Sequence, residues 1–122
     1  MTEHSEAGEI LTEMWARIDA RQWDRLAELL DPDVQVRYVH TGELLDFNGI
    51  LRANSDYPGR WRANVEELVS VGPRAVSRTR LDDGESTFHV ATFATTARGR
   101  ITAMTEVWTD TGQPAHPSRL QP

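Results

Sequence analysis

The chain has 122 residues, a net charge of −6 and 39% hydrophobic residues, which suffices for one domain with a buried core. Its acidic balance argues against nucleic acid or an anionic membrane as a partner, because phosphate binding needs a basic face. The sequence has neither Cys nor Lys, which excludes disulfides, thiolate chemistry and lysine Schiff bases.

The N-terminal part predicts two helices. A four-residue apolar spacing over residues 5–20 indicates an amphipathic helix, with Ser5 as a possible N-cap. The residues that carry this spacing are Ile10, Met14 and Ile18. A shorter helix is expected over residues 23–30, and we expect the Asp31-Pro32-Asp33 segment to end it.

The remaining chain predicts strands and one more short helix, which begins at Asn48 or Gly49 and ends near Ser55. Alternating or β-branched runs indicate strands over residues 34–40, 44–47, 61–71, 75–81, 85–96 and 100–109. Segregated helices and strands predict an α+β fold, in which a curved antiparallel (mixed) sheet wraps on three N-terminal helices. We expect one domain over residues 1–110 and a proline-containing tail over residues 111–122.

The last expected strand carries the most informative side chain. Strand residues alternate between faces, so Met104, Glu106 and Trp108 share one face. A carboxylate between a Met and a Trp is not needed for strand stability. Pairing across a tight turn at residues 98–99 then predicts an inward set on the preceding strand: Thr87, His89, Ala91 and Phe93.

These elements and several motifs resemble the nuclear transport factor 2-like superfamily, and within it the SnoaL-like branch. The motifs lie at residues 18–26, 30–34, 42–49, 99–101 and 106–110. The resemblance implies a cone-shaped, cystatin-like α+β barrel with a deep and largely apolar pocket. It also implies a homodimer that forms through the sheet.

Function varies widely among members of this superfamily, so the fold does not decide it. The positions that match the ketosteroid isomerase base and oxyanion carboxyl look like Tyr38 and Ala91. The position of its helical tyrosine falls near Met14 or Trp15. None of these residues has the required group. SnoaL-like cyclases place an acidic base on a late strand, which Glu106 matches.

We therefore predict a pocket for a small cyclic or polyketide-like metabolite, with proton-transfer catalysis as an isomerase, cyclase or dehydratase. Glu106 would be the base, His89 would hold or relay the proton, and Tyr38 would donate a hydrogen bond to a developing enolate. No metal or cofactor is expected. The expected ligand-binding side chains are Trp15, His40, Tyr57, Trp61, Phe93, Met104 and Trp108.

Other interpretations stay open at this point. Glu106 could lie at the mouth of the cone and pair with Arg78 or Arg80, or a one-residue slip could turn it outward. A two-histidine, one-carboxylate metal site from His40, His89 and Glu106 has no support from their spacing. The alternative function is a non-catalytic module for small-molecule binding or dimerisation. The expected partners are a small apolar or aromatic molecule and a second copy of the chain, in the cytoplasm of a bacterium, with no nucleic acid and no membrane.

Overall fold

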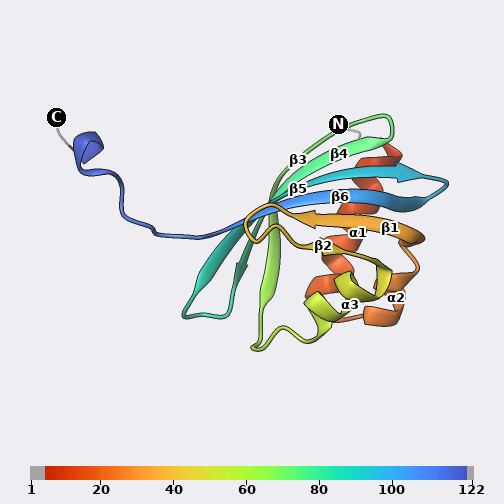
Figure 1. Cartoon of the computed structure of the whole chain (residues 1–122), viewed down its shortest axis with the longest axis horizontal. Coiled ribbons are helices and arrows are strands. Elements are labelled where there is room, and N and C mark those ends of the chain that lie inside the picture. The colour runs from red at the N-terminus through yellow and green to blue at the C-terminus, as the bar shows by residue number, and fades with distance from the viewer. Residues whose placement is uncertain (1–4, 121–122) are drawn as a thin grey trace.

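The structure is a computed structural model that describes residues 5–120. Its elements are α1 (Glu6–Asp19), α2 (Trp23–Ala27), β1 (Leu30–Tyr38), β2 (Leu44–Leu45), α3 (Phe47–Ser55), β3 (Arg62–Val71), β4 (Arg74–Asp82), β5 (Thr87–Ala97), β6 (Arg100–Asp110) and the 3₁₀ helix η1 (Pro117–Leu120). The strands form one sheet in the order β2-β1-β6-β5-β4-β3 (Figure 1). The predicted α+β class with three helices and a curved mixed sheet is confirmed. The predicted domain of residues 1–110 and tail of residues 111–122 both reach outside the described residues, and that division stays a prediction.

The structure differs from the sequence-based expectation at several element boundaries and in the tail. The second helix ends at Ala27, because β1 already begins at Leu30. The pairing of β1 with β6 is irregular between Leu30 and Gln35, and this interruption tolerates Pro32, which has no N–H to donate. In the tail, residues 117–120 form η1 where no regular structure was expected, and this segment leads away from the sheet (Figure 1).

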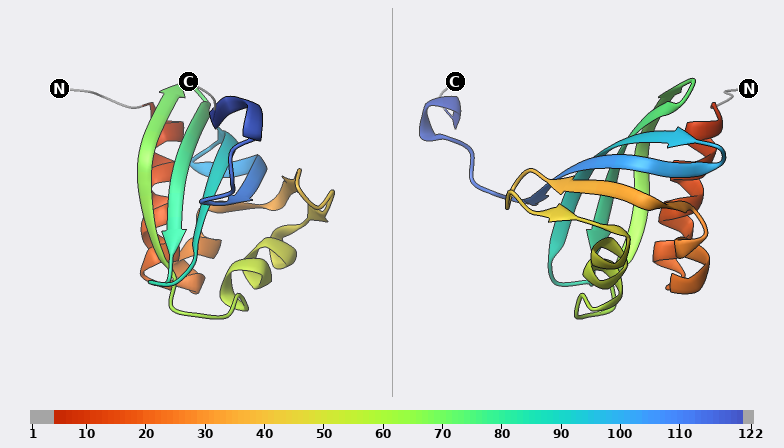
Figure 2. Two further views of the ribbon diagram at one scale, coloured as in Figure 1. Left: turned by 90° about the vertical axis from the view of Figure 1, so that its left-hand side faces the viewer. Right: turned by 45° about the vertical axis from the view of Figure 1, so that its right-hand side comes forward.

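The sheet curves around the helices, and β6 lies near its middle (Figure 2). β6 pairs in parallel with β1 and antiparallel with β5. α1 packs mainly on β3 and β4, while α3 packs on β1. The concave face is therefore buried under helices, and Leu11 of α1 and Val90 of β5 are both fully buried there.

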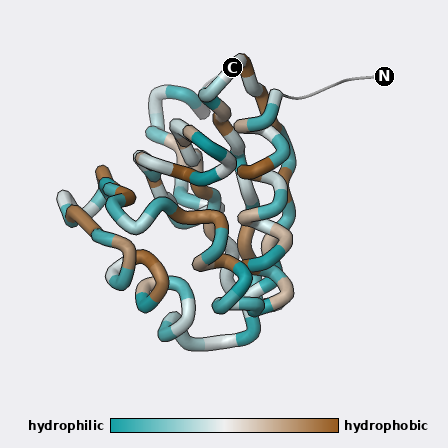
Figure 3. Tube along the Cα trace, turned by 90° about the vertical axis from the view of Figure 1, so that its right-hand side faces the viewer, coloured by the Kyte–Doolittle hydropathy of each residue, from teal (hydrophilic) through white to brown (hydrophobic). Residues whose placement is uncertain are grey.

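Side-chain alternation separates the two faces of the sheet. β4 is the clearest case, with inward Ala75, Ser77 and Thr79 buried and outward Arg78 and Arg80 exposed. Hydrophobic and hydrophilic residues accordingly alternate along the chain trace (Figure 3). A sheet with this pattern packs one face on the core and leaves the other free for solvent or a partner.

A β-bulge at Thr102 sets which side chains of β5 face inward. Ala97 pairs with Arg100 beside the turn, but Thr95 pairs with Ala103, which leaves Thr102 as an extra residue in β6. One extra residue in β6 shifts its pairing with β5 by one position, so the β5 side chains expected on the inner face lie on the outer face instead. The inward set is therefore Val90, Thr92 and Ala94, opposite Trp108, Glu106 and Met104. The prediction that Thr87, His89, Ala91 and Phe93 face inward is wrong.

Candidate functional site

A pocket of about 380 Å³ lies between the C-terminal ends of α1 and α3 and the concave face of the sheet. This volume falls within the range of small-molecule sites. Six aromatic side chains line it: Trp23, Tyr38, Tyr57, Trp61, Phe88 and Trp108. Its polar lining consists of Asp19, Arg21, His40, Asn54, Thr109, Asp110 and Gln113. The pocket therefore offers flat apolar walls and a small number of polar groups.

One aromatic wall comes from β1 and β6. The structure places Tyr38 and His40 on the pocket lining, where their rings stack with centroids 5.4 Å apart. The ring of Trp108 meets Tyr38 edge-on at 6.4 Å. Burial, followed by the charge of Glu106, raises the pKa of Tyr38. Its phenol therefore keeps its proton and remains a hydrogen-bond donor at neutral pH.

Glu106 is the buried acid beside this wall. The residue is 3% exposed, and its Oε2 accepts a 2.6 Å hydrogen bond from the hydroxyl of Thr92. Its Oε1 accepts a 3.3 Å hydrogen bond from the indole N–H of Trp108. Burial raises the pKa of Glu106 to about 6, while the two hydrogen bonds oppose this shift because they favour the carboxylate. The carboxyl therefore changes charge close to neutral pH.

Glu106 borders a small inner void rather than the main pocket. The void has a volume of about 10 Å³, close to the space that one water molecule needs. Trp15 and Met104 line this void and not the pocket, which corrects their expected positions. Ile18 and Asn54 line both spaces. These two side chains therefore separate the pocket from the buried carboxyl.

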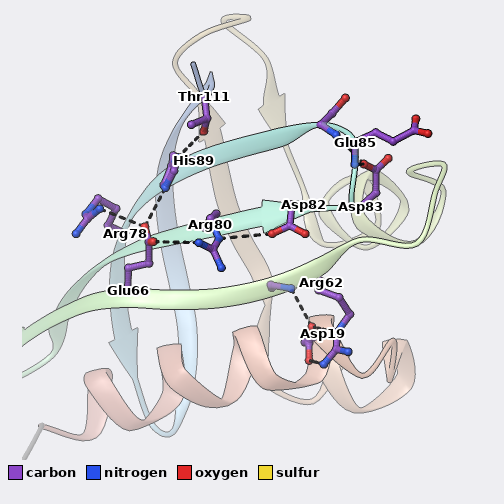
Figure 4. Close-up of polar contacts among 12 residues, drawn as sticks. Asp19, Arg62, Glu66, Arg78, Arg80, Asp82, Asp83, Glu85, His89 and Thr111 are labelled. Carbon is purple, nitrogen blue, oxygen red and sulfur yellow. Dashed lines mark hydrogen bonds and ion pairs between the residues drawn. The ribbon is translucent and has the colours of Figure 1, made fainter. Parts of the chain in front are cut away.

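An ion pair ties the start of β3 to the end of α1. Asp19 accepts hydrogen bonds of 2.9 and 3.0 Å from the guanidinium of Arg62 (Figure 4). It also accepts a 2.8 Å hydrogen bond from the backbone N–H of Ala63. The hydrogen bonds from Arg62 are the main cause that lowers the pKa of Asp19. Asp19 therefore stays charged and acts as a structural clamp at the edge of the pocket.

The second aromatic wall lies on the segment just before β3. Arg21 donates hydrogen bonds of 3.1 and 3.2 Å to the carbonyl oxygens of Gly59 and Trp61. The rings of Tyr57 and Trp61 lie 5.6 Å apart, and those of Trp61 and Phe88 lie 5.0 Å apart. The end of α1 thus holds this wall in place opposite Trp108.

Two of the expected site residues lie on the opposite, outer face of the sheet. His89 Nε2 is 2.9 Å from Glu66 Oε1, and His89 Nδ1 is 2.5 Å from the hydroxyl of Thr111 (Figure 4). Phe93 is 41% exposed. The predicted roles of His89 as a proton relay and Phe93 as a ligand contact are therefore wrong, and the bulge at Thr102 is the reason.

The outer face also accounts for the two arginines considered as partners of Glu106. Arg78 Nη1 lies 3.2 Å and Arg80 Nη1 lies 4.0 Å from the carboxylate of Glu66. The interpretation in which Glu106 pairs with either arginine is therefore wrong. The burial of Glu106 also excludes the register that would turn it outward.

The model of the SnoaL-like domain family matches residues 11–104, which is most of the chain. The chain belongs to the SnoaL-like domain family. This finding and the solved structures below confirm the predicted nuclear transport factor 2-like superfamily. No curated protein matches this SnoaL-like domain in sequence.

Solved structures share the fold of this SnoaL-like domain at low identity. A candidate ketosteroid isomerase from Kribbella flavida DSM 17836 is 24% identical, with a TM-score of 0.84 over 96% of this chain and 88% of that chain. IdmH, a candidate polyketide cyclase from Streptomyces antibioticus, is 14% identical, with a TM-score of 0.72 over 84% and 91% of the two chains. A de novo designed protein with a curved β-sheet is 11% identical, with a TM-score of 0.73 over 87% of each chain. Because even a designed protein shares it, the likeness shows the fold alone.

The residues that line the pocket of the SnoaL-like domain and were missed from the sequence include Asp19, Asn54, Phe88 and Asp110. Asn54 lies four residues after the buried Ile50 on α3, and this spacing on one helix face was a usable signal. Within residues 5–120, no three His, Asp or Glu side chains gather closely enough to hold a metal ion. In the same part of the chain, no helix combines the length and apolar character of a membrane span.

Proposed function

We propose that this SnoaL-like domain catalyses a proton transfer on a small cyclic or polyketide-like molecule, as an isomerase, cyclase or dehydratase. Glu106 is the general acid–base group. The supporting observation is a buried carboxyl with a pKa of about 6 beside an aromatic pocket of about 380 Å³. A group that titrates near the working pH is suited both to accept a proton and to return it.

The proposed chemistry begins at a carbon next to a substrate carbonyl. Glu106 takes a proton from this carbon, and the electron pair moves onto the carbonyl oxygen to form an enolate. The phenol of Tyr38 donates a hydrogen bond to that oxygen. Asn54 supplies a second donor, because only one of its two amide hydrogens is used, in a 2.9 Å bond to the carbonyl of Ile50. Glu106 then returns the proton to another atom of the substrate.

The side chains of Ile18 and Asn54 form the barrier between the pocket and Glu106, and the reacting part of the substrate must pass this barrier. A ring seated in the pocket brings its reacting carbon to this barrier, and a small displacement of the Ile18 side chain would join the pocket to the inner void while Asn54 keeps its hydrogen bond to Ile50. The same separation favours a second candidate function, in which the pocket binds a small molecule without catalysis. In that case Glu106 serves only the packing of the pocket floor.

Deuterium exchange of 2-tetralone in D₂O, followed by proton NMR, tests the proposal without the natural substrate. We expect the wild-type protein to accelerate exchange of the hydrogens next to the carbonyl, and Glu106→Gln to lose this acceleration. His89→Ala is the matched control and should exchange like the wild type. Exchange by Glu106→Gln at the wild-type rate would remove Glu106 from the chemistry. Binding of 2-tetralone without accelerated exchange by the wild type would favour the second candidate.

We also propose that the protein works as a homodimer that forms through the outer face of the sheet. Apolar side chains on this face are 37–77% exposed: Val69, Val71, Val76, Phe93 and Val107. Contiguous exposed apolar side chains of this kind mark interaction surfaces. Its location in a bacterial cytoplasm stays a prediction from the sequence.

A further inference from the structure

The inward face of β6 carries one acid at the mouth of the pocket and another behind its floor. After the bulge, Glu106, Trp108 and Asp110 point to the same side at intervals of about 7 Å, since a strand rises about 3.4 Å per residue. Glu106 lies behind the floor, Trp108 forms the wall, and Asp110 lies at the mouth opposite Phe88. A ligand in the pocket therefore lies between two carboxyl groups.

The charges around the pocket do not cancel both of these acids. Asp19 and Arg62 neutralise each other through their bidentate contact. Arg21 is the remaining cation of the lining, and it already donates to the carbonyls of Gly59 and Trp61. Within residues 5–120, the carboxylate of Asp110 has no ion-pair partner. An anionic ligand would thus meet like charge both at the mouth and at the floor.

The aromatic walls favour the opposite charge. The face of an aromatic ring attracts a cation, and cages of such rings recognise ammonium groups. Phe88 lies opposite Asp110 in the strand register, and both line the pocket together with Trp61 and Trp108. Aromatic rings and an unpaired carboxylate therefore occur together at the mouth.

We propose that the pocket selects ring molecules that carry a protonated amine, with the ring between the aromatic walls and the ammonium group beside Asp110. This inference rests on the proposed function of the pocket and names the class of its ligand. The neutral part of the ligand faces the barrier and Glu106. Since the ammonium binds at the mouth, it leaves the base free to act on the other end of the molecule.

Three molecules with the same ring test this charge selection by isothermal titration calorimetry. They are 2-naphthylmethylamine, 2-naphthylmethanol and 2-naphthoate, measured at low salt and about pH 7.5, where an alkyl ammonium is charged. We expect the amine to bind about tenfold more tightly than the alcohol. The carboxylate should bind more weakly than the alcohol. Equal affinities, or tighter binding of the carboxylate through Arg21, would overturn the inference.

The Asp110→Asn variant tests whether the carboxylate of Asp110 causes the preference for the amine. We expect this variant to lose most of the preference for the amine and to keep its affinity for the alcohol. Glu67→Gln is the matched control, because it removes the same charge from an exposed position on β3 outside the pocket. Unchanged amine binding by Asp110→Asn overturns the inference, while binding of the alcohol leaves the proposed pocket function intact. If none of the three molecules binds, the proposed function fails as well.

Discussion

The hydroxyl of Thr92 donates a 2.6 Å hydrogen bond to Oε2 of Glu106 across the β5–β6 pair. Both residues are buried, at 0% and 3% exposure. A hydrogen bond to the carboxylate favours its charged form, whereas burial favours the neutral form. Thr92 therefore limits how far burial raises the pKa of Glu106, and this gives the site a second residue to test.

Removal of this hydroxyl should shift the pKa of Glu106 further upward. Thr92→Val keeps the shape of the side chain and leaves the carboxylate without its shortest hydrogen bond. We expect a loss of about 1–3 kcal/mol in the free energy of unfolding at pH 8, and a smaller loss at pH 4, where Glu106 is neutral. Urea unfolding at both pH values measures the difference.

Thr79→Val is the matched control for this prediction. Thr79 is also fully buried on the concave face, but its hydroxyl has no hydrogen-bond partner among residues 5–120. Replacing an unpaired hydroxyl by a methyl group should be neutral or stabilising at both pH values. An equal loss of stability in the two valine variants would contradict a special role for the Thr92 hydrogen bond.

Glu106 should make the folded protein less stable as the pH rises. Its pKa is about 6 in the folded protein against a reference value of 4.5, so the folded state holds the proton more tightly than the unfolded state. The contribution of Glu106 to stability is therefore fully present below pH 4.5 and is lost as the pH rises through about 6. At pH 8, Glu106→Gln should be more stable than the wild type by up to about 2 kcal/mol.

The pH dependence of unfolding is the measurement for this prediction. At pH 4 the two proteins should differ little, because the amide and the neutral carboxyl have similar shapes and Thr92 can rotate its hydroxyl to suit either one. A glutamine variant that is less stable by the same amount at pH 4 and pH 8 would show that the charge of Glu106 has no energetic cost.

The sequence predicted the inward face of β6 but not that of β5. Alternation within one strand is a local property, so Met104, Glu106 and Trp108 followed directly from their spacing. The facing of His89 and Phe93 depended on the pairing between two strands, and the bulge at Thr102 changed that pairing by one residue. No residue type at this position signals a bulge.

Asp19 should stabilise the folded protein more through the hydrogen bond from the backbone N–H of Ala63 than through its ion pair with Arg62. The side chain of Arg62 is 78% exposed, so Arg62→Ala should change the free energy of unfolding by less than about 1 kcal/mol. Asp19→Asn keeps an acceptor for the N–H of Ala63 and should cost little. Asp19→Ala loses this acceptor and should cost about 1–2 kcal/mol.

Chemical unfolding of the three variants at neutral pH distinguishes these contributions. Because its folded pKa is lowered, Asp19 contributes stability above pH 3.8 that is lost as the pH falls through the folded value. The charge-dependent part of the Asp19→Ala loss should therefore disappear under strongly acidic conditions, while the part from the lost acceptor for Ala63 should remain. Equal losses in Asp19→Ala and Arg62→Ala at neutral pH would instead assign the clamp to the ion pair.

The proposed homodimer should depend on the outer face of the sheet. Phe93 lies next to Val76 in the β4–β5 register, and both are exposed. Phe93→Asp places a charge in this apolar surface and should convert the dimer to a monomer in size-exclusion chromatography with light scattering. Leu44→Asp, on the short strand β2 and 70% exposed, is the control and should leave the mass unchanged.

β6 contributes side chains to both faces of the sheet. Because successive side chains alternate between the faces, the residues that serve the pocket differ from those that serve the outer surface. Glu106 and Trp108 face the helices, while Thr105 and Val107 point to the opposite side. An evolving gene can therefore exchange the inward residues and acquire a new substrate while the outward residues, and any assembly that depends on them, stay the same. A strand of this kind lets chemistry and assembly diverge independently, and protein engineers can use the same independence when they redesign the pocket.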